Sequence, residues 1–198
     1  MITQLISDQV DKKEIEIIIR ELKKVLDNNI IGDVTEFGCY LGTTSVYLAK
    51  TLMSTSERLL YVYDSFAGLP EKNSKDISPL GESFKTGELL ASKKQFIKNM
   101  HQHGVPMPHI TKAWFADIQA ADLPDKVAFA YLDGDYYMSI VDSLRALNGR
   151  LSSGATIVVD DYGNAALPGV AKAIDEWLQT HTAIKKVEHS LAIIYVKR

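Results

Sequence analysis

The chain has 198 residues, with 22 lysines and arginines against 25 aspartates and glutamates, and 46% of its residues are hydrophobic. This is ordinary globular composition, so it excludes fibrous, repetitive and largely disordered proteins. The net charge of −3 argues against general attraction to nucleic acid or to an anionic membrane, and it favours a small-molecule substrate.

Cysteine content and hydropathy indicate where such a chain acts. Cys39 is the only cysteine, so no intramolecular disulfide forms, which fits a reducing cytoplasm. The first 15 residues lack the apolar core of a signal peptide, and no apolar run approaches the roughly 18 residues that cross a bilayer. We therefore expect a cytoplasmic protein with a small-molecule partner and without nucleic-acid or membrane partners, and we leave a homodimer open.

Helical and strand-like patterns alternate along the chain. The patterns first predict a helix that has its apolar positions at 15–26 and ends at Asn28-Asn29, then a strand at 33–37 and a helix capped by Thr43 or Thr44 that runs to about 53. They go on to predict a strand at 59–63, a helix at 90–102, strands at 110–113 and 127–132, a helix at 139–147, a strand at 155–159, a helix at 168–178, and strands at 185–188 and 192–196. Asp8 or Asp11 is the expected cap of the first helix.

This alternation predicts an α/β fold with a single doubly wound, mostly parallel sheet that ends in a C-terminal antiparallel hairpin. We find no repeat, low-complexity tract or linker. One domain over residues 1–198 is therefore expected, with a helical segment at 1–32 and a ligand-binding core at 33–198.

A loop-like segment follows the second predicted strand. Residues 65–87 are broken by Pro70, Pro79, Gly81 and Gly87. Unstructured connections of this length are uncommon in compact domains and are often functional. We expect the segment to be mobile without ligand and ordered by it.

The first chemical motif, Glu36-Phe37-Gly38-Cys39-Tyr40-Leu41-Gly42, lies between a predicted strand and a helix. Glycines there let the backbone approach a ligand, and the helix presents free N–H groups. The spacing differs from the dinucleotide G-x-G-x-x-G, and the Glu36 carboxylate suits a locally cationic ligand such as an aminoacyl sulfonium. Asp64 ends the second strand, where an acid accepts ribose hydroxyls. Each feature alone also fits a tight turn or a cap, but together they favour an adenosine ligand.

Carboxylates follow two further strands. Asp133 and Asp135 come after an apolar run, and Asp160 and Asp161 come after the next predicted strand. Ligands of open parallel sheets bind at this edge, and neighbouring strands lie about 4.8 Å apart. Single acids at such positions are usually caps or turn residues. Four of them at one edge would repel one another, which favours a counter-cation, and oxygen-only ligands suit Mg²⁺.

Other positions carry weaker signals. Trp114 and Phe115 follow the third strand and either stack on an adenine or belong to the core. His101 and His103 form an H-x-H near a helix end, where a surface position is favoured. Cys39 lies in the glycine motif without an evident activating histidine, so a nucleophilic role is not expected.

Taken together, these motifs resemble the macrocin O-methyltransferase family, which comprises metal-dependent class I methyltransferases that modify sugar hydroxyls on natural products. The resemblance runs from about residue 33 to residue 178. The resemblance rests on four segments: residues 36–42 (EFGCYLG), 63–70 (YDSFAGLP), 133–137 (DGDYY) and 160–163 (DDYG).

The resemblance implies S-adenosylmethionine as the cofactor, Mg²⁺ as the metal and specific residues for each. The expected cofactor contacts are Glu36, Gly38, Tyr40, Gly42, Asp64 and Ser65, to which we add Thr43 and Thr44 at the helix start and Trp114 and Phe115. Asp133, Asp160 and Asp161 are the implied metal ligands, with Asp135 as general base. Asp133 and Asp135 are thus the expected catalytic pair.

The resulting hypothesis is in-line transfer of a sulfonium methyl group to a hydroxyl of a small molecule, most simply a sugar of a natural product or glycan. Asp135 would take the hydroxyl proton. Three other functions remain open: methylation of a catechol or another phenol, a nicotinamide oxidoreductase, and a non-catalytic adenosyl-ligand binding protein. The missing G-x-G-x-x-G and the acidic cluster count against the oxidoreductase.

Overall fold

The computed structural model describes residues 5–53, 57–81 and 84–197, so positions 82–83 of the predicted loop and 1–4 of the N-terminal segment lie outside the described residues. The helices are α1 (Lys12–Asp27), α2 (Thr43–Met53), α3 (Lys93–Gln102), α4 (Tyr137–Leu147) and α5 (Pro168–Leu178), with short 3-10 turns η1 (Ser74–Asp76), η2 (Phe115–Asp117) and η3 (Ala120–Asp122). The strands are β1 (Asp33–Phe37), β2 (Leu60–Asp64), β3 (His109–Lys112), β4 (Val127–Leu132), β5 (Leu151–Val159), β6 (Ala183–Glu188) and β7 (Leu191–Val196).

These strands form one seven-stranded sheet in the order β3-β2-β1-β4-β5-β7-β6. The first five are parallel, while β7 is antiparallel to both β5 and β6. Phe37 of β1 is in register with Tyr63 of β2 and Leu132 of β4, and Leu132 is in register with Val159 of β5. The carboxyl ends of four strands therefore meet at one edge of the sheet.

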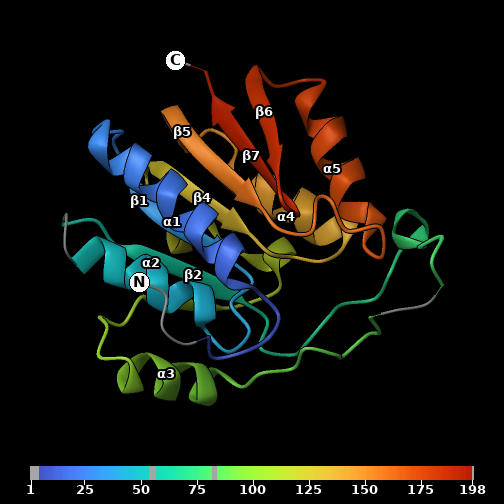
Figure 1. Cartoon of the computed structure of the whole chain (residues 1–198), viewed down its shortest axis with the longest axis horizontal. Helices are drawn as coiled ribbons and strands as arrows, with labels where there is room; N and C mark the ends of the chain where they lie inside the picture. The colour runs from blue at the N-terminus through green and yellow to red at the C-terminus, as the bar shows by residue number, and fades with distance from the viewer. Residues whose placement is uncertain (1–4, 54–56, 82–83, 198) are drawn as a thin grey trace.

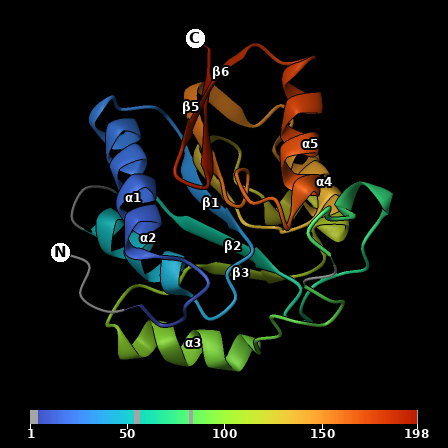
Figure 2. The same ribbon diagram turned by 45° about the vertical axis from the view of Figure 1, so that its right-hand side comes forward.

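Helices cover both faces of this sheet (Figures 1 and 2). One core joins α1, α2 and α3 to the sheet through residues such as Ile18, Leu48 and Phe96. The other core joins α4 and α5 to the opposite face. Along β5 the side chains alternate, because Val158 belongs to the first core and Val159 to the second. This is the doubly wound architecture with a terminal hairpin that the sequence predicts.

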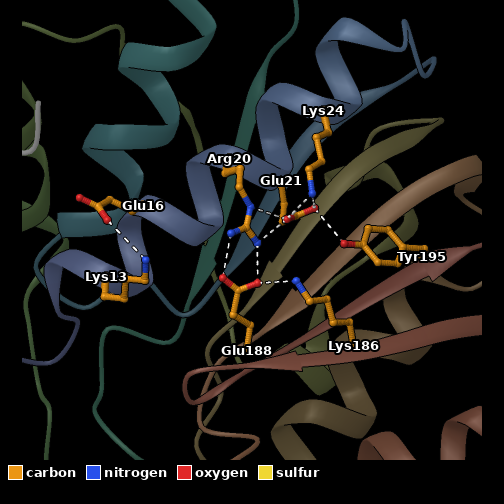
Figure 3. Close-up of polar contacts among 8 residues, drawn as sticks. All are labelled: Lys13, Glu16, Arg20, Glu21, Lys24, Lys186, Glu188 and Tyr195. Atoms are coloured by element: carbon orange, nitrogen blue, oxygen red, sulfur yellow. Dashed lines mark hydrogen bonds and ion pairs between the residues drawn. The ribbon is translucent and has the colours of Figure 1, made fainter.

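Helix α1 is capped at one end and bound to the hairpin along its side. Asp11 and Glu14 form a capping box, which identifies Asp11 rather than Asp8 as the cap. Figure 3 shows Arg20 donating to Glu188 of β6 at 2.8 Å and to Glu21 at 2.7 Å. Glu21 is fully buried and also accepts from Lys24. Sequence-distant elements are thus joined by charge-assisted hydrogen bonds.

The segment at 65–87 is held in place by contacts that its sequence does not reveal. Asp76 is buried, and its carboxylate accepts the backbone N–H of Tyr137 at 2.7 Å. The hydroxyl of Tyr136 donates to the carbonyl of Phe84 at 2.9 Å. Two hydrogen bonds therefore attach this segment to the start of α4, and its mobility without ligand stays a prediction.

Predicted and observed elements agree in type and order. The largest differences lie at element ends: the helix expected from 90 begins at Lys93 with Ser92 as its cap, and the strand expected from 155 begins at Leu151. Pro168 occupies the first turn of α5, as predicted. Within the described part of the chain, no helix combines the length and the apolar character that a membrane span requires.

Candidate active site

One cavity of about 440 Å³ opens at the sheet edge where the parallel strands end. Among the predicted site residues, nine line this cavity: Gly38, Tyr40, Asp64, Ser65, Trp114, Phe115, Asp133, Asp135 and Asp161. Five predicted residues do not line it: Glu36, Gly42, Thr43, Thr44 and Asp160. The cavity thus joins both predicted motifs in one space.

The loop after β1 depends on a glycine. Gly38 has a φ of +87°, and a Cβ placed on it would lie 1.9 Å from the carbonyl oxygen of Asp133. The loops after β1 and β4 therefore touch at this point, and any side chain would force them apart. Tyr40 follows with a φ of 47°, an uncommon conformation for a residue with a side chain.

Asp64 holds this loop from the neighbouring strand. One of its carboxylate oxygens accepts the backbone N–H groups of Cys39 at 2.9 Å and Tyr40 at 3.2 Å, and the other accepts that of Phe66 at 2.7 Å. A carboxylate offers about four acceptor positions, so about one remains free. Asp64 therefore shapes the glycine loop as well as lining the cavity.

Glu36 lies beneath the loop, outside the cavity lining, and is fully buried. It accepts a hydrogen bond from the hydroxyl of Ser45, while its Oε1 is buried without a partner among the described residues. Burial raises the pKa of Glu36 to about 8, and the charge of Asp64 adds to the effect. An unpartnered buried carboxylate oxygen fits a site that receives a cationic ligand group.

At the start of α2, the two predicted cofactor contacts Thr43 and Thr44 do not line the cavity. The hydroxyl of Thr43 accepts the backbone N–H of Ser7 at 3.2 Å, and Thr44 is buried. This contact attaches the N-terminal segment beside the glycine loop, and the next two residues, Asp8 and Gln9, line the cavity. The sequence carries no periodic pattern or motif that marks these two residues as part of a site.

Carboxylates from two strand ends converge on the cavity. Oxygens of Asp133, Asp135 and Asp161 all lie within 4.8 Å of one another. Burial raises the pKa of Asp133 well above its ordinary value, with the charge of Asp160 as the next cause, and burial and Asp161 raise the pKa of Asp135 to about 7. Such a cluster of mutually repelling oxygen donors suits a hard divalent cation.

Two of these acids also have unusual backbone conformations. Asp135 has a φ of 59° and Asp161 a φ of 56°. Positive φ is uncommon for residues with a side chain and is frequent at functional sites, where the surrounding structure imposes it. Both turns direct carboxylates into the cavity, as the lining residues show.

Asp160 has a different environment from its neighbour. It is buried, accepts the hydroxyl of Tyr131 at 2.5 Å and accepts the backbone N–H of Asp161 at 2.9 Å. The same Tyr131 hydroxyl lies 3.5 Å from Asp133. Asp160 therefore adjoins the cluster through Tyr131, and its role as a metal ligand stays a prediction.

Sequence reasoning missed two residues that position the cluster. Tyr131 is one, and its signal is the strand alternation that places residue 131 on the same side as Asp133, two positions later. Asn164 is the other: its amide donates to Asp161 at 2.9 Å, and it lines the cavity. Nothing in the sequence around Asn164 distinguishes it from an ordinary turn residue.

The two aromatic residues after β3, Trp114 and Phe115, have different environments. Trp114 is 40% exposed and lines the cavity. Phe115 also lines it, and packs edge-on against Phe37 of the core at 5.5 Å between ring centroids. Phe115 therefore both lines the cavity and packs against the core, and its stacking on an adenine stays a prediction.

The sequence of this chain matches a family model and individual proteins of known function. The sequence model of the macrocin-O-methyltransferase (TylF) family matches residues 8–195. A Streptomyces olivaceus protein named 8-demethyl-8-(2,3-dimethoxy-alpha-L-rhamnosyl)-tetracenomycin-C 4'-O-methyltransferase is 29% identical over 71% of this chain and 57% of its own length. Demethyldecarbamoylnovobiocin O-methyltransferase of Streptomyces niveus is 26% identical over 83% of this chain and 65% of its own length. The match thus spans less than two thirds of either relative.

Solved structures share the fold. The O-methyltransferase NovP superposes with a TM-score of 0.78 at 23% identity, covering 94% of this chain and 80% of that chain. The calicheamicin methyltransferase CalS11 also gives a TM-score of 0.78, at 18% identity, covering 92% of this chain and 78% of that chain.

Proposed function

Because the chain belongs to the macrocin O-methyltransferase family, we propose that it is an S-adenosylmethionine- and Mg²⁺-dependent O-methyltransferase. The proposed acceptor is a hydroxyl of a small molecule, most simply a sugar of a natural product, because the name of the Streptomyces olivaceus relative includes a rhamnosyl group. We further propose that residues 1–198 act as one methyltransferase domain. The observation that carries the proposal is a single cavity that reaches both Asp64 and the acidic cluster.

The loop after β1 is the proposed site for the methionyl part of the cofactor. S-adenosylmethionine supplies a methyl group activated by a positively charged sulfur. Gly38 lets the backbone come close to such a ligand. Burial raises the pKa values of the nearby Glu36 and Asp133 carboxyl groups, and a bound cationic sulfur would favour their ionised forms. Asp64 offers its remaining acceptor position to a ribose hydroxyl.

Asp133, Asp160 and Asp161 are the proposed metal ligands. Mg²⁺ held there would lower the pKa of an acceptor hydroxyl. Asp133 and Asp161 already face each other across the cavity, and Asp160 adjoins them through the Tyr131 hydroxyl. Asn164 fixes the Asp161 carboxylate, so the ligand set is oriented by neutral hydrogen-bond donors on two sides.

Asp135 is the proposed general base. Its carboxylate lies with Asp133 and Asp161 at the cavity, and the positive charge of a metal ion held by those residues would keep it ionised and able to take the proton of the acceptor hydroxyl. The remaining work of the protein is orientation, because an acceptor oxygen must approach the methyl carbon from the side opposite the sulfur. The surrounding walls, including Leu89 and Phe84, keep apolar surface around the reacting atoms.

The test combines binding with transfer. Calorimetry should detect binding of S-adenosylhomocysteine, and mass spectrometry should detect one added methyl group on a rhamnoside or related glycoside incubated with S-adenosylmethionine and Mg²⁺. A catechol belongs in the same panel, because methylation of the catechol alone would replace the sugar acceptor by a phenol. Absence of S-adenosylhomocysteine binding would contradict the proposed function.

A further inference from the structure

Two of the proposed metal ligands lie on residues 160–164, the metal loop, and this loop adjoins the C-terminal hairpin. The last residue of β5 is in register with the second residue of β7, and the two strands are antiparallel. The turn that joins β6 to β7, residues 189–190, therefore lies beside the metal loop. The backbone N–H of Gly163 donates to the carbonyl oxygen of Ser190 at 2.8 Å. The hairpin thus contacts the outer side of the loop.

This turn is itself attached to α1. The hydroxyl of Ser190 donates to the carboxylate of Glu14, which is only 9% exposed. Glu14 also belongs to the capping box at the start of α1. Ser190 therefore connects the metal loop, through its carbonyl and its hydroxyl, to a capped helix end.

A second contact holds the metal loop through Tyr162. Its ring does not line the cavity and packs against the core beneath α4 and α5. Its hydroxyl donates to Asp175 of α5 at 2.9 Å and accepts from the ammonium group of Lys185 of β6. Lys185 also pairs with Asp175 at 2.5 Å. The three side chains therefore form a closed network on the side of the loop away from the cavity.

The position of these contacts in the loop gives them their meaning. Asp161 has a φ of 56°, and its carboxylate lines the cavity. Such a conformation is uncommon for a residue with a side chain and persists where the surrounding structure imposes it. The next two residues, Tyr162 and Gly163, are the ones that the hairpin holds. The hairpin therefore fixes the direction in which Asp161 points.

From this geometry we propose that the C-terminal hairpin positions Asp161 for the divalent cation, with Lys185 and Ser190 as positioning residues. The inference rests on the proposed function, which places the metal at the acidic cluster. Groups that hold metal ligands from outside typically contribute about 10–100-fold to metal affinity. Lys185 acts through Tyr162 and the loop backbone and not through its charge, since a nearby positive charge opposes binding of a cation.

The test measures Mn²⁺ affinity, from the electron paramagnetic resonance signal of free Mn²⁺, and S-adenosylhomocysteine affinity by calorimetry. Lys185→Met keeps the aliphatic stem but removes the donor, and it should weaken Mn²⁺ binding about tenfold and leave S-adenosylhomocysteine affinity unchanged. Lys185→Arg keeps a cationic donor and should retain most of the wild-type Mn²⁺ affinity. Tyr162→Phe breaks the same network, so the double variant should bind Mn²⁺ about as Lys185→Met alone does.

The matched control is Lys186→Met. Lys186 is the next residue of β6 and pairs with Glu188, the partner of Arg20 on α1, at 2.6 Å (Figure 3). Both substitutions remove one positive charge from the hairpin, so electrostatics alone predicts unchanged or tighter Mn²⁺ binding in both variants. Weaker binding in Lys185→Met together with wild-type binding in Lys186→Met therefore identifies positioning.

Three results would overturn the inference: wild-type or higher Mn²⁺ affinity in Lys185→Met, an equal loss in Lys186→Met, or a parallel loss of Mn²⁺ and S-adenosylhomocysteine affinity in Lys185→Met, which indicates a general structural role. If wild-type protein binds S-adenosylhomocysteine but not Mn²⁺, the proposed metal site fails, and this inference fails with it. If it binds Mn²⁺ but not S-adenosylhomocysteine, the cofactor proposal fails, and the Mn²⁺ affinities of the variants still decide the inference.

Discussion

At the residue scale, Asp64 shapes the glycine loop and is also the proposed acceptor for a ribose hydroxyl. Its carboxylate accepts three backbone N–H groups, from Cys39, Tyr40 and Phe66, and has about one acceptor position left. A change at this residue therefore acts on the loop and on the ligand together. This double role distinguishes Asp64 from a surface acid that only contacts a ribose.

We predict that Asp64→Ala weakens S-adenosylhomocysteine binding by about 1–3 kcal/mol, because it removes a charged acceptor and frees the loop. Calorimetry measures the loss. Asp125→Ala is the matched control, since Asp125 is exposed and precedes β4 at the opposite edge of the sheet. Equal affinities for wild type and Asp64→Ala would remove Asp64 from the nucleotide site.

At the scale of elements, the attachment of α1 to the hairpin is a pH-dependent source of stability. Hydrogen bonds from Arg20 lower the pKa of Glu188 to about 2. A carboxyl group whose pKa is lowered on folding stabilises the protein above its unfolded pKa, about 4.3 for glutamate. This contribution is lost as the pH falls from about 4.5 toward 2.

Arg20→Ala should therefore lower the free energy of unfolding by about 1–2 kcal/mol at neutral pH, and the difference from wild type should shrink below pH 4.5. Denaturant titrations at several pH values measure this. Lys13→Ala is the control on the same helix, because Lys13 and Glu16 form an exposed pair at 3.9 Å (Figure 3) and the change should cost less than about 0.5 kcal/mol. A pH-independent loss in Arg20→Ala would show that packing, not the ion pair, is responsible.

Another element-scale link joins the segment after β2 to α4. Asp76 accepts the N–H of Tyr137, the first residue of α4, and the side chain of the N-cap residue Tyr136 makes no capping hydrogen bond to this helix. Asp76 thus caps a helix distant in sequence, and that helix carries one wall of the cavity.

Removal of the Asp76 cap should increase local opening of the segment after β2 and of the first turn of α4. Asp76→Ala is expected to lower the free energy of unfolding by about 2 kcal/mol and to speed hydrogen exchange in residues 69–90 and in the first turn of α4. Asp76→Asn keeps an acceptor oxygen and should lose less. Exchange rates that match wild type in Asp76→Ala would mean that other contacts hold the segment.

At the scale of the whole molecule, the sequence predicts the architecture and one side of the site. Strand alternation and glycine position are local signals, so the sheet, the terminal hairpin and the placement of Gly38, Asp64 and Asp133 around one cavity follow from them. The packing of Asp133 against Gly38 is a consequence of parallel strands that end in register.

Contacts between distant segments account for what the sequence does not predict. Asp76 and Asn164 look like ordinary loop residues, and their partners lie on other elements. Glu36 is fully buried and does not line the cavity, because it lies inside a buried strand, and its predicted contact with the cofactor stays a prediction.

We propose that the acidic cluster serves the acceptor, while the glycine loop and Asp64 hold the cofactor. Methyl transfer from S-adenosylmethionine to a glycoside, measured with and without a chelator in parallel with S-adenosylhomocysteine affinity, tests it most directly. We predict that chelation abolishes transfer, that added Mg²⁺ restores it, and that S-adenosylhomocysteine affinity changes little. Transfer that continues at the same rate in the presence of the chelator would contradict the account and leave the cluster a structural role.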